Sequence, residues 1–219
     1  MVYVPTFNSV ARPAPMWRAV LASACLILSG LSPSPAVADD STSNATDHPA
    51  EDDGPLVING CPIWPYTRCP GADLRHADLL GKNLAGADLR DAKLVRADLR
   101  GANLAGANLE GADLTAARLN KANIPGANLR NARLIGADME SARLMHSNLS
   151  GADLTGASLE HARLNYAWFE GAKLLSCNLQ EAKFVAANLN NAVMEACVTR
   201  FTTFPDASFT NCQGCPSDW

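Results

Sequence analysis

Aromatic side chains are scarce in this sequence: they make up 6% of its 219 residues, although 47% of the residues are hydrophobic. Alanine and leucine supply most of the apolar content. A globular core of this size would use more large side chains, because protein interiors are filled to a high and uniform packing density. We therefore expect a narrow and regular interior rather than an ordinary globular core.

Sequence motifs for catalysis, phosphate binding and metal binding are missing as well. There is no nucleophile elbow, no phosphate loop and no zinc motif, and the four histidines lack the spacing of metal ligands. These histidines are His48, His76, His146 and His161. A run of about 20 apolar residues, the length that spans a membrane, is also absent. We therefore predict a protein that is not an enzyme, uses no cofactor or metal and has no stable membrane insertion in its mature form.

A shorter apolar run near the N-terminus has the pattern of a secretory signal peptide. Two arginines precede the apolar residues 19–31, and the sequence Ala-Val-Ala at residues 36–38 forms a cleavage site. We predict that residues 1–38 are removed and that the protein is exported to the periplasm, to the extracellular space or, if the source has one, to a thylakoid lumen. Either Met1 or Met16 can be the start of this signal.

Lysine and arginine are absent from residues 39–53, which carry six acidic side chains. A polar, acidic stretch with few large apolar groups does not form a core, so we expect an acidic disordered linker over residues 39–55. From Gly71 to Cys212 the sequence has 15 acidic and 15 basic residues. The net charge of −4 therefore comes from the linker, and the repetitive body that follows it is neutral.

Six cysteines remain once Cys25 is removed with the signal peptide. An even number of cysteines in an exported protein suggests disulfides, although six cysteines allow 15 full pairings. Cys61 and Cys69 flank the start of the repetitive body, and Cys212 and Cys215 follow its end. We predict one disulfide at each end. The C-x-x-C spacing of the second pair also leaves thiol–disulfide redox activity open as an alternative.

The body of the sequence repeats every five residues, as in "GANLAGANLEGADL" at residues 101–114. A five-residue step turns an α-helix by about 500°, so successive leucines drift around its axis, and in one long strand the step alternates faces. A unit that restarts every five residues avoids both problems, with Ala and Leu pointing inward, the residue between them pointing outward and the other two turning a corner. The Leu position recurs 28 times from Leu74 to Phe209, and 23 of the 28 positions two residues earlier are Ala.

These repeats, as in "GADLRHADLLGKNLAGADLRDAKL", closely resemble those of the pentapeptide-repeat proteins, whose consensus is A-(D/N)-L-x-x. The resemblance covers residues 72–209 and implies an all-β fold, a right-handed quadrilateral β-helix with four repeats per coil and about seven coils. A rod of this kind has two open ends, so we expect an N-terminal cap at residues 56–71 and a C-terminal cap or tail at residues 210–219. Dimerisation through a cap occurs in the family and implies a homodimer here, with the C-terminal aromatic residues as its candidate surface.

If four repeats close a coil, residues 20 apart are neighbours along the axis. One outward row then alternates in charge, and opposite charges on adjacent rungs should stabilise each other. Its members are Asp73, Lys93, Asp113, Arg133, Asp153 and Lys173. A second row begins with asparagines, whose amides can bond along the axis, and ends with three basic residues. Its members are Asn83, Asn103, Asn123, Arg143, Arg163 and Lys183. For the basic residues we expect salt bridges to Glu140 and Glu160 at the preceding corner, or else a site for an anion or an acidic partner.

Apolar residues also occur at outward positions, and they form the remaining candidate interaction surface. Val95, Ile135 and Leu175 belong to one row, where stacking that stiffens the ladder is the alternative explanation. Tyr166 and Trp168 lie nearby, and Trp168 interrupts a row of asparagines. We expect Trp168 to be the residue of this group that binds a partner.

Together these features predict an exported, non-enzymatic solenoid that serves as a structural scaffold or protein-interaction module for a protein or cell-envelope component. One alternative follows from the resemblance, since some pentapeptide-repeat proteins mimic DNA and regulate or inhibit type II topoisomerases. That role needs a strongly negative surface, which a body with 15 acidic and 15 basic residues does not provide. We also expect no nucleic-acid partner. The second alternative is a thiol–disulfide redox protein.

Overall fold

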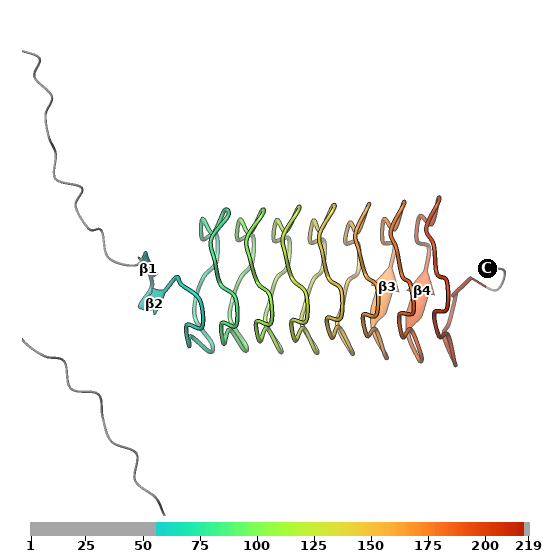
Figure 1. Ribbon diagram of the computed structural model, residues 1–219, viewed down its shortest axis with the longest axis horizontal. Helices are drawn as coiled ribbons and strands as arrows, with labels where there is room; N and C mark the ends of the chain where they lie inside the picture. The colour runs from blue at the N-terminus through green and yellow to red at the C-terminus, as the bar shows by residue number, and fades with distance from the viewer. Residues whose placement is uncertain (1–55, 217–219) are drawn as a thin grey trace, which may run out of the picture. The chain divides into compact units, whose positions relative to one another are not determined.

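The structure of the protein is a computed structural model that describes residues 56–216. Over these residues the chain winds into a β-helix solenoid, with each coil stacked on the one before it (Figure 1). The predicted signal peptide at residues 1–38 and the predicted linker at residues 39–55 lie outside the described residues, as do residues 217–219.

Each five-residue unit consists of a short extended segment and a tight turn. In one such unit, the backbone N–H of Ala97 donates to the carbonyl oxygen of Leu94 at 3.0 Å and closes a turn around Val95 and Arg96. Arg96 has a φ of 56°, in the left-handed region that a turn of this type requires at its third position. Many units place glycine there, and a residue with a side chain pays about 1–2 kcal/mol for the same conformation.

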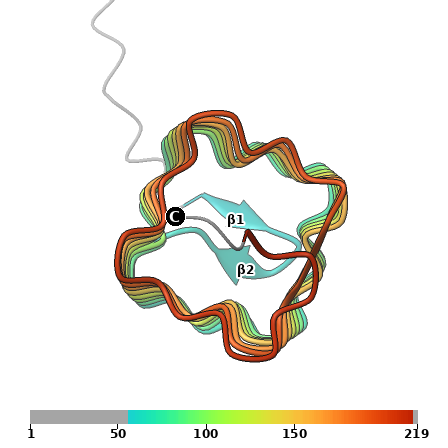
Figure 2. The ribbon, with the colours of Figure 1, turned by 90° about the vertical axis from the view of Figure 1, so that its right-hand side faces the viewer.

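Successive coils pair in parallel with a register of 20 residues. The bridges run from Arg68↔Asp88 to Val193↔Gln213 along the solenoid. The pairing widens to three residues between strand β3 (Lys173–Leu175) and strand β4 (Val193–Glu195). Seen along the axis, the coils superpose, so residues 20 apart lie on the same side of the rod (Figure 2). The prediction that such residues are axial neighbours is confirmed.

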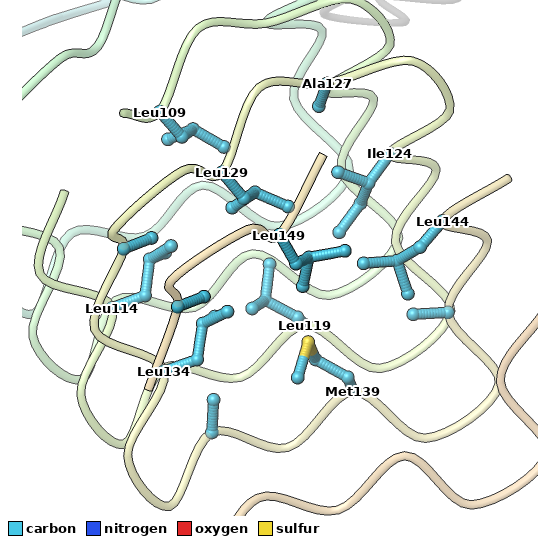
Figure 3. Packing of buried hydrophobic residues seen from close by; sticks show 14 of the residues in the cluster. Leu109, Leu114, Leu119, Ile124, Ala127, Leu129, Leu134, Met139, Leu144 and Leu149 are labelled. Carbon is cyan, nitrogen blue, oxygen red and sulfur yellow. The ribbon is translucent and has the colours of Figure 1, made fainter. Parts of the chain in front are cut away.

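The interior is filled by the Leu and Ala positions of the repeat. Leu109, Leu129 and Leu149 follow one another on successive coils and point inward (Figure 3). Full burial of a leucine contributes about 1.5–3 kcal/mol, so the ladders of leucines dominate the stability of the rod. Ser147 replaces Ala at one buried position, and its hydroxyl donates to the carbonyl oxygen of Leu144 at 2.6 Å, so no polar group of that side chain is left unsatisfied.

A β-hairpin covers the N-terminal end of the solenoid (Figures 1 and 2). Strands β1 (Val57–Ile58) and β2 (Cys61–Pro62) are antiparallel and joined by Asn59 and Gly60, whose positive φ values suit a two-residue hairpin turn. The side-chain amide of Asn59 donates to the carbonyl oxygen of Asp73 at 2.7 Å. This bond and the burial of Cys61 attach the hairpin to the first coil.

The solenoid begins one unit earlier than its predicted start at residue 72. Axial pairing already includes Arg68, and the flanking Thr67 and Cys69 are buried at the positions that Ala and Leu occupy elsewhere. The prediction placed these residues in the cap, because neither residue type belongs to the repeat consensus. Five residues of the predicted N-terminal cap are therefore part of the first coil.

Phenylalanines replace leucines inside the C-terminal coils. Ring centroids lie 5.5 Å apart between Phe169 and Phe184, 4.8 Å apart between Phe184 and Phe204, and 5.6 Å apart between Phe204 and Phe209. Axial pairing ends at Gln213, one unit beyond the predicted end at residue 209.

Candidate interaction surface

The row of alternating charge forms no ion pairs between rungs among residues 56–216. Asp73 and Lys93 are bridged neighbours, yet the carboxylate of Asp73 accepts from Nε of Arg75, two residues along the same unit, at 2.8 Å. Asp113 likewise accepts from the backbone N–H of Thr115 at 3.0 Å. An aspartate readily bonds to the backbone two residues further on, and this turns its carboxylate toward the corner. The predicted stabilisation between rungs therefore acts without direct ion pairs: the charge of Lys93 contributes to the lowered pKa of Asp73, and the charges of Lys173 and Arg133 to that of Asp153.

These local bonds keep the surface carboxylates ionised. The hydrogen bonds from Arg75 lower the pKa of Asp73 to about 2. The pKa values of Asp88 and Asp98 are also lowered, in each case chiefly by hydrogen bonds from the arginine two residues on. Asp73, Asp88 and Asp98 are therefore each neutralised by an arginine of their own unit.

The asparagine ladder forms as predicted. Nδ2 of Asn103 donates to Oδ1 of Asn83, and Nδ2 of Asn123 donates to Oδ1 of Asn103, both at 3.0 Å. The side-chain nitrogen of each asparagine therefore donates to the side-chain oxygen of the asparagine one coil earlier.

The three basic residues that continue this row are exposed and unpaired; we call Arg143, Arg163 and Lys183 the basic row. Arg143 bridges Arg163, and Arg163 bridges Lys183, so they occupy consecutive rungs. No ion pair joins any of them to a carboxylate in the described part of the chain. The predicted salt bridges to Glu140 and Glu160 are therefore wrong, and the basic row is an uncompensated positive strip.

The nearby glutamates are bonded elsewhere. Oε2 of Glu160 accepts from Nδ2 of Asn178 at 2.9 Å, and its Oε1 lies 3.5 Å from Nε2 of His161. Oε2 of Glu181 lies 3.2 Å from Nδ1 of the same histidine. Both carboxylates thus lie next to His161, and neither forms an ion pair with the basic row.

A shallow hollow of about 410 Å³ lies beside the basic row. Its lining residues are Lys121, Asn123, Ser141, Arg143, His161 and Arg163. Sequence reasoning missed Lys121, Ser141 and His161, although these three residues are spaced by 20 and form the corner row next to the basic row. The signal was present, because the register that placed the outward rows places the corner rows as well.

Two large aromatic side chains protrude nearby, Tyr166 at the next corner and Trp168 in the outward row that follows it. Together with His146 we call them the aromatic corner. Tyr166 is 50% and Trp168 53% exposed. The rings of Tyr166 and His146 stack with their centroids 4.9 Å apart and an interplanar angle of 2°. Trp168 lies in a row between Asn148 and Asn188 and lines a hollow of about 390 Å³. The stack holds Tyr166 in place, whereas the hollow beside Trp168 is otherwise lined by polar residues and a glycine.

The other apolar candidates are less accessible. Val95, Ile135 and Leu175 are each partly buried in their corner row. Their partial burial agrees with the alternative of stacking along the axis. The aromatic corner is thus the part of the candidate surface that offers the most apolar area to a partner.

The structure pairs Cys61 with Cys69 and Cys212 with Cys215, with Cα atoms 5.7 Å apart in both pairs. Cys177 and Cys197 stay as thiols on adjacent rungs, the first buried and the second partly exposed. The hydrogen bond between these two thiols lowers the pKa of Cys197 to about 7. The same bond, together with burial, raises the pKa of Cys177.

We predict that iodoacetamide labels the folded protein at Cys197 and leaves Cys177 unlabelled. Alkylation needs the thiolate, so the rate at Cys197 should rise as the pH increases through about 7, its folded-state pKa. Mass spectrometry of peptides from samples quenched at several pH values measures this rate. A Cys197→Ser variant should lose the label, and equal labelling of both cysteines would contradict the prediction.

The described residues contain no cluster of three or more histidine, cysteine or acidic side chains that could hold a metal ion. Within the same residues, no helix has the length and apolar character needed to cross a membrane. The candidate site consists of two outer surfaces, the basic row with its hollow and the aromatic corner.

The sequence matches a protein-family model. The model described as pentapeptide repeats matches eight times, within residues 67–104, 92–131, 112–151, 122–160, 137–174 and 177–213. Together these segments cover about two-thirds of the chain. No protein with a curated description matches the sequence.

Several solved structures resemble the chain. QnrB1, a plasmid-mediated fluoroquinolone resistance protein, is 19% identical over 71% of this chain and 86% of its own, with a TM-score of 0.44. HetL, a protein involved in heterocyst differentiation regulation from the cyanobacterium Nostoc sp. strain PCC 7120, is 26% identical over 68% of this chain and 85% of its own, with a TM-score of 0.28. A protein from the Arabidopsis thaliana thylakoid lumen is 28% identical over 54% of this chain and 68% of its own, with a TM-score of 0.24. All three TM-scores lie below 0.5, so these likenesses carry no argument about function.

Proposed function

This chain belongs to the pentapeptide-repeat family, and from that premise we propose that it is an exported, non-enzymatic scaffold that binds a partner protein through its outer surface. Members of a repeat family share an architecture, whereas the partner depends on the side chains that each member displays. The outward side chains of this particular chain therefore determine which partner it binds.

The observation that carries the proposal is the aromatic corner. Tyrosine, tryptophan and arginine are the residue types that most often dominate the energy of protein interfaces. Tyr166 and Trp168 are half exposed on a rod whose neighbouring outward residues are mostly asparagine and charged residues. A large exposed aromatic residue in a row of asparagines adds nothing to the axial ladder of amides, so contact with a partner is the better explanation.

We further propose a right-handed, four-sided solenoid of about seven coils, as the family resemblance implies. The 20-residue register supports four sides, because it holds four five-residue units. The 28 units from Leu74 to Phe209 then fill seven coils.

The proposal of export rests on the signal-peptide pattern and on the paired cysteines at both ends. An intact mass of the protein recovered from a fractionated bacterial host tests it. We expect a chain that begins at Asp39, lighter by two hydrogen atoms for each disulfide. An uncleaved cytoplasmic chain with free thiols would contradict export.

We also propose a homodimer through the C-terminal end, where Phe209 and Pro216 line a cavity of about 640 Å³. Its support is the resemblance to the family and the aromatic residues at this end, of which Phe201 is exposed and Phe209 partly buried. Light scattering of the protein at increasing concentration measures the oligomeric state. A monomer at all concentrations would contradict it.

Site-specific photo-crosslinking tests the function of the aromatic corner. A photoreactive phenylalanine analogue replaces Trp168 in one variant and, in a matched control, Asn108 of the same row three coils away. We expect a crosslinked product from the Trp168 position alone, which an excess of the unmodified protein suppresses and an excess of a Trp168→Ala protein does not. No product at Trp168, or equal products at both positions, would overturn the proposal.

A further inference from the structure

We propose that the basic row and the hollow beside it bind an acidic segment of the partner protein. This inference rests on the proposed function, because it specifies the chemistry of the partner. The site consists of Arg143, Arg163 and Lys183 on three consecutive rungs, with Lys121 at the corner of the hollow.

The charge of the basic row is unbalanced because of where its residues lie in the repeat. Elsewhere an arginine follows the inward Leu and pairs with an aspartate two residues before it, as Arg100 pairs with Asp98 at 2.6 Å. In the basic row the cation itself occupies the place of that aspartate. The residues two places on are Met145, Asn165 and Val185, and none of them is acidic. The local pairing that neutralises other units is therefore unavailable here.

The neighbouring rungs do not balance the charge either. In the row of alternating charge, each cation has at least one aspartate on a neighbouring rung: Lys93 has Asp73 and Asp113, and Lys173 has Asp153. The basic row has cations as its own axial neighbours and is bounded by Asn123 and Thr203. Like charges on adjacent rungs destabilise each other, and a bound anion relieves this repulsion.

The acidic groups around the site leave it open. Glu160 and Glu181 both turn toward His161, with the distances given above. Glu140 makes no ion pair within residues 56–216. Carboxylates are thus present close by, yet none of them occupies the space in front of the arginines.

The hollow presents mainly hydrogen-bond donors. The guanidinium groups of Arg143 and Arg163 each carry five N–H groups, and the ammonium of Lys121 carries three. Asn123 uses one amide hydrogen for Asn103 and keeps the second, and Ser141 adds a hydroxyl. Carboxylates match this arrangement, because a guanidinium binds their two oxygens side by side.

The length of the basic row favours a polypeptide over a small anion. Three rungs span two strand spacings, about 10 Å, which an extended peptide covers in about three residues. A short run of acidic residues can therefore contact all three cations, whereas one small anion cannot. The aromatic corner begins three residues after Arg163 on the same rung, so a peptide held by the basic row lies within reach of Tyr166.

A titration of the full-length protein with a fluorescein-labelled hexaglutamate peptide tests this inference by fluorescence anisotropy. We expect the double variant Arg143→Ala/Arg163→Ala to bind at least 10-fold more weakly than the parent protein. The matched control, Lys93→Ala/Lys173→Ala, removes the same charge from the row of alternating charge and should bind within about 2-fold of the parent. Binding should also weaken as salt increases, because exposed charges are screened.

Three results would overturn the inference: no binding to the parent protein, an equal loss in the control variant, or inorganic pyrophosphate that binds as tightly as the peptide. Thermal unfolding of each variant, followed by circular dichroism, shows that the fold is retained. Crosslinking at Trp168 that persists while peptide binding is absent would refute only the acidic partner. Loss of both would refute the proposed function as well.

Discussion

Replacement of Phe184 by alanine is expected to lower the free energy of unfolding by about 3–5 kcal/mol. The side chain is fully buried and lies between Phe169 and Phe204 in the C-terminal coils. The cavity left behind cannot collapse easily, because hydrogen-bonded coils fix the walls of the rod on either side. Urea denaturation of the variant and the parent protein measures the difference.

The matched control for this prediction is Trp168→Ala, which removes an even larger aromatic side chain from the outside of the same region. Since Trp168 is 53% exposed, its loss should change the free energy of unfolding by no more than about 0.5 kcal/mol. A loss below 1 kcal/mol at Phe184, or equal losses at both positions, would contradict the description of the core. Coils contact only their neighbours, so hydrogen exchange in the Phe184→Ala variant should increase first in the coils near residue 184.

The double substitution Cys61→Ser/Cys69→Ser should lower the free energy of unfolding by about 2–3 kcal/mol. The expected disulfide closes a loop with a sequence separation of 8, and it restricts the unfolded chain accordingly. The bond also ties the hairpin of β1 and β2 to the first coil, so the N-terminal end of the core should become exposed without it. Thermal unfolding with and without a reducing agent measures the effect.

In this experiment the parent protein in reducing agent should approach the stability of the double variant, and the variant itself should not respond. The corresponding substitutions at Cys212 and Cys215 provide a control, because their sequence separation of 3 closes a much shorter loop and the loss should be smaller. A parent protein that is insensitive to the reducing agent would show that the first bond is absent.

The interior of this protein could be predicted from the sequence almost residue by residue. A period of five leaves few ways to bury Ala and Leu together, and the positions from Leu74 to Met194 that carry them are buried as expected, Ala72 at the first coil being only partly so. The 20-residue register followed from the same pattern. Backbone hydrogen bonds and an uninterrupted repeat determine these features jointly, so no single side chain can change them.

The outer surface was harder to predict, because there the side chains choose among several partners. Charge alternation indicated that neighbouring rungs stabilise each other, but it did not indicate that Asp113 also bonds within its own unit to Thr115. Proximity in sequence suggested that Glu160 would neutralise the basic row, whereas it bonds to Asn178 and His161. On an exposed surface these alternatives differ by a fraction of a kcal/mol to about 1 kcal/mol, too little for a residue pattern to decide.

The two ends required information that the repeat does not contain. Cys69 takes a leucine position in the first coil, and no consensus indicates this. The stack of His146 on Tyr166 could have been found from their spacing of 20, since the register applies at corners as well as on faces. The 20-residue register therefore predicts contacts between aromatic residues at corners as well as on the faces.

The 20-residue register has a consequence for how the length of this chain can change during evolution. Loss or gain of one five-residue unit leaves every local turn intact, yet it moves all later residues to the next side of the rod. Trp168 would then leave the row of Asn148, and the basic row would be divided. Duplication or deletion of 20 residues instead lengthens or shortens the rod by one rung and keeps every row aligned. Whole coils are therefore the step in which such a protein can grow without losing its binding surfaces.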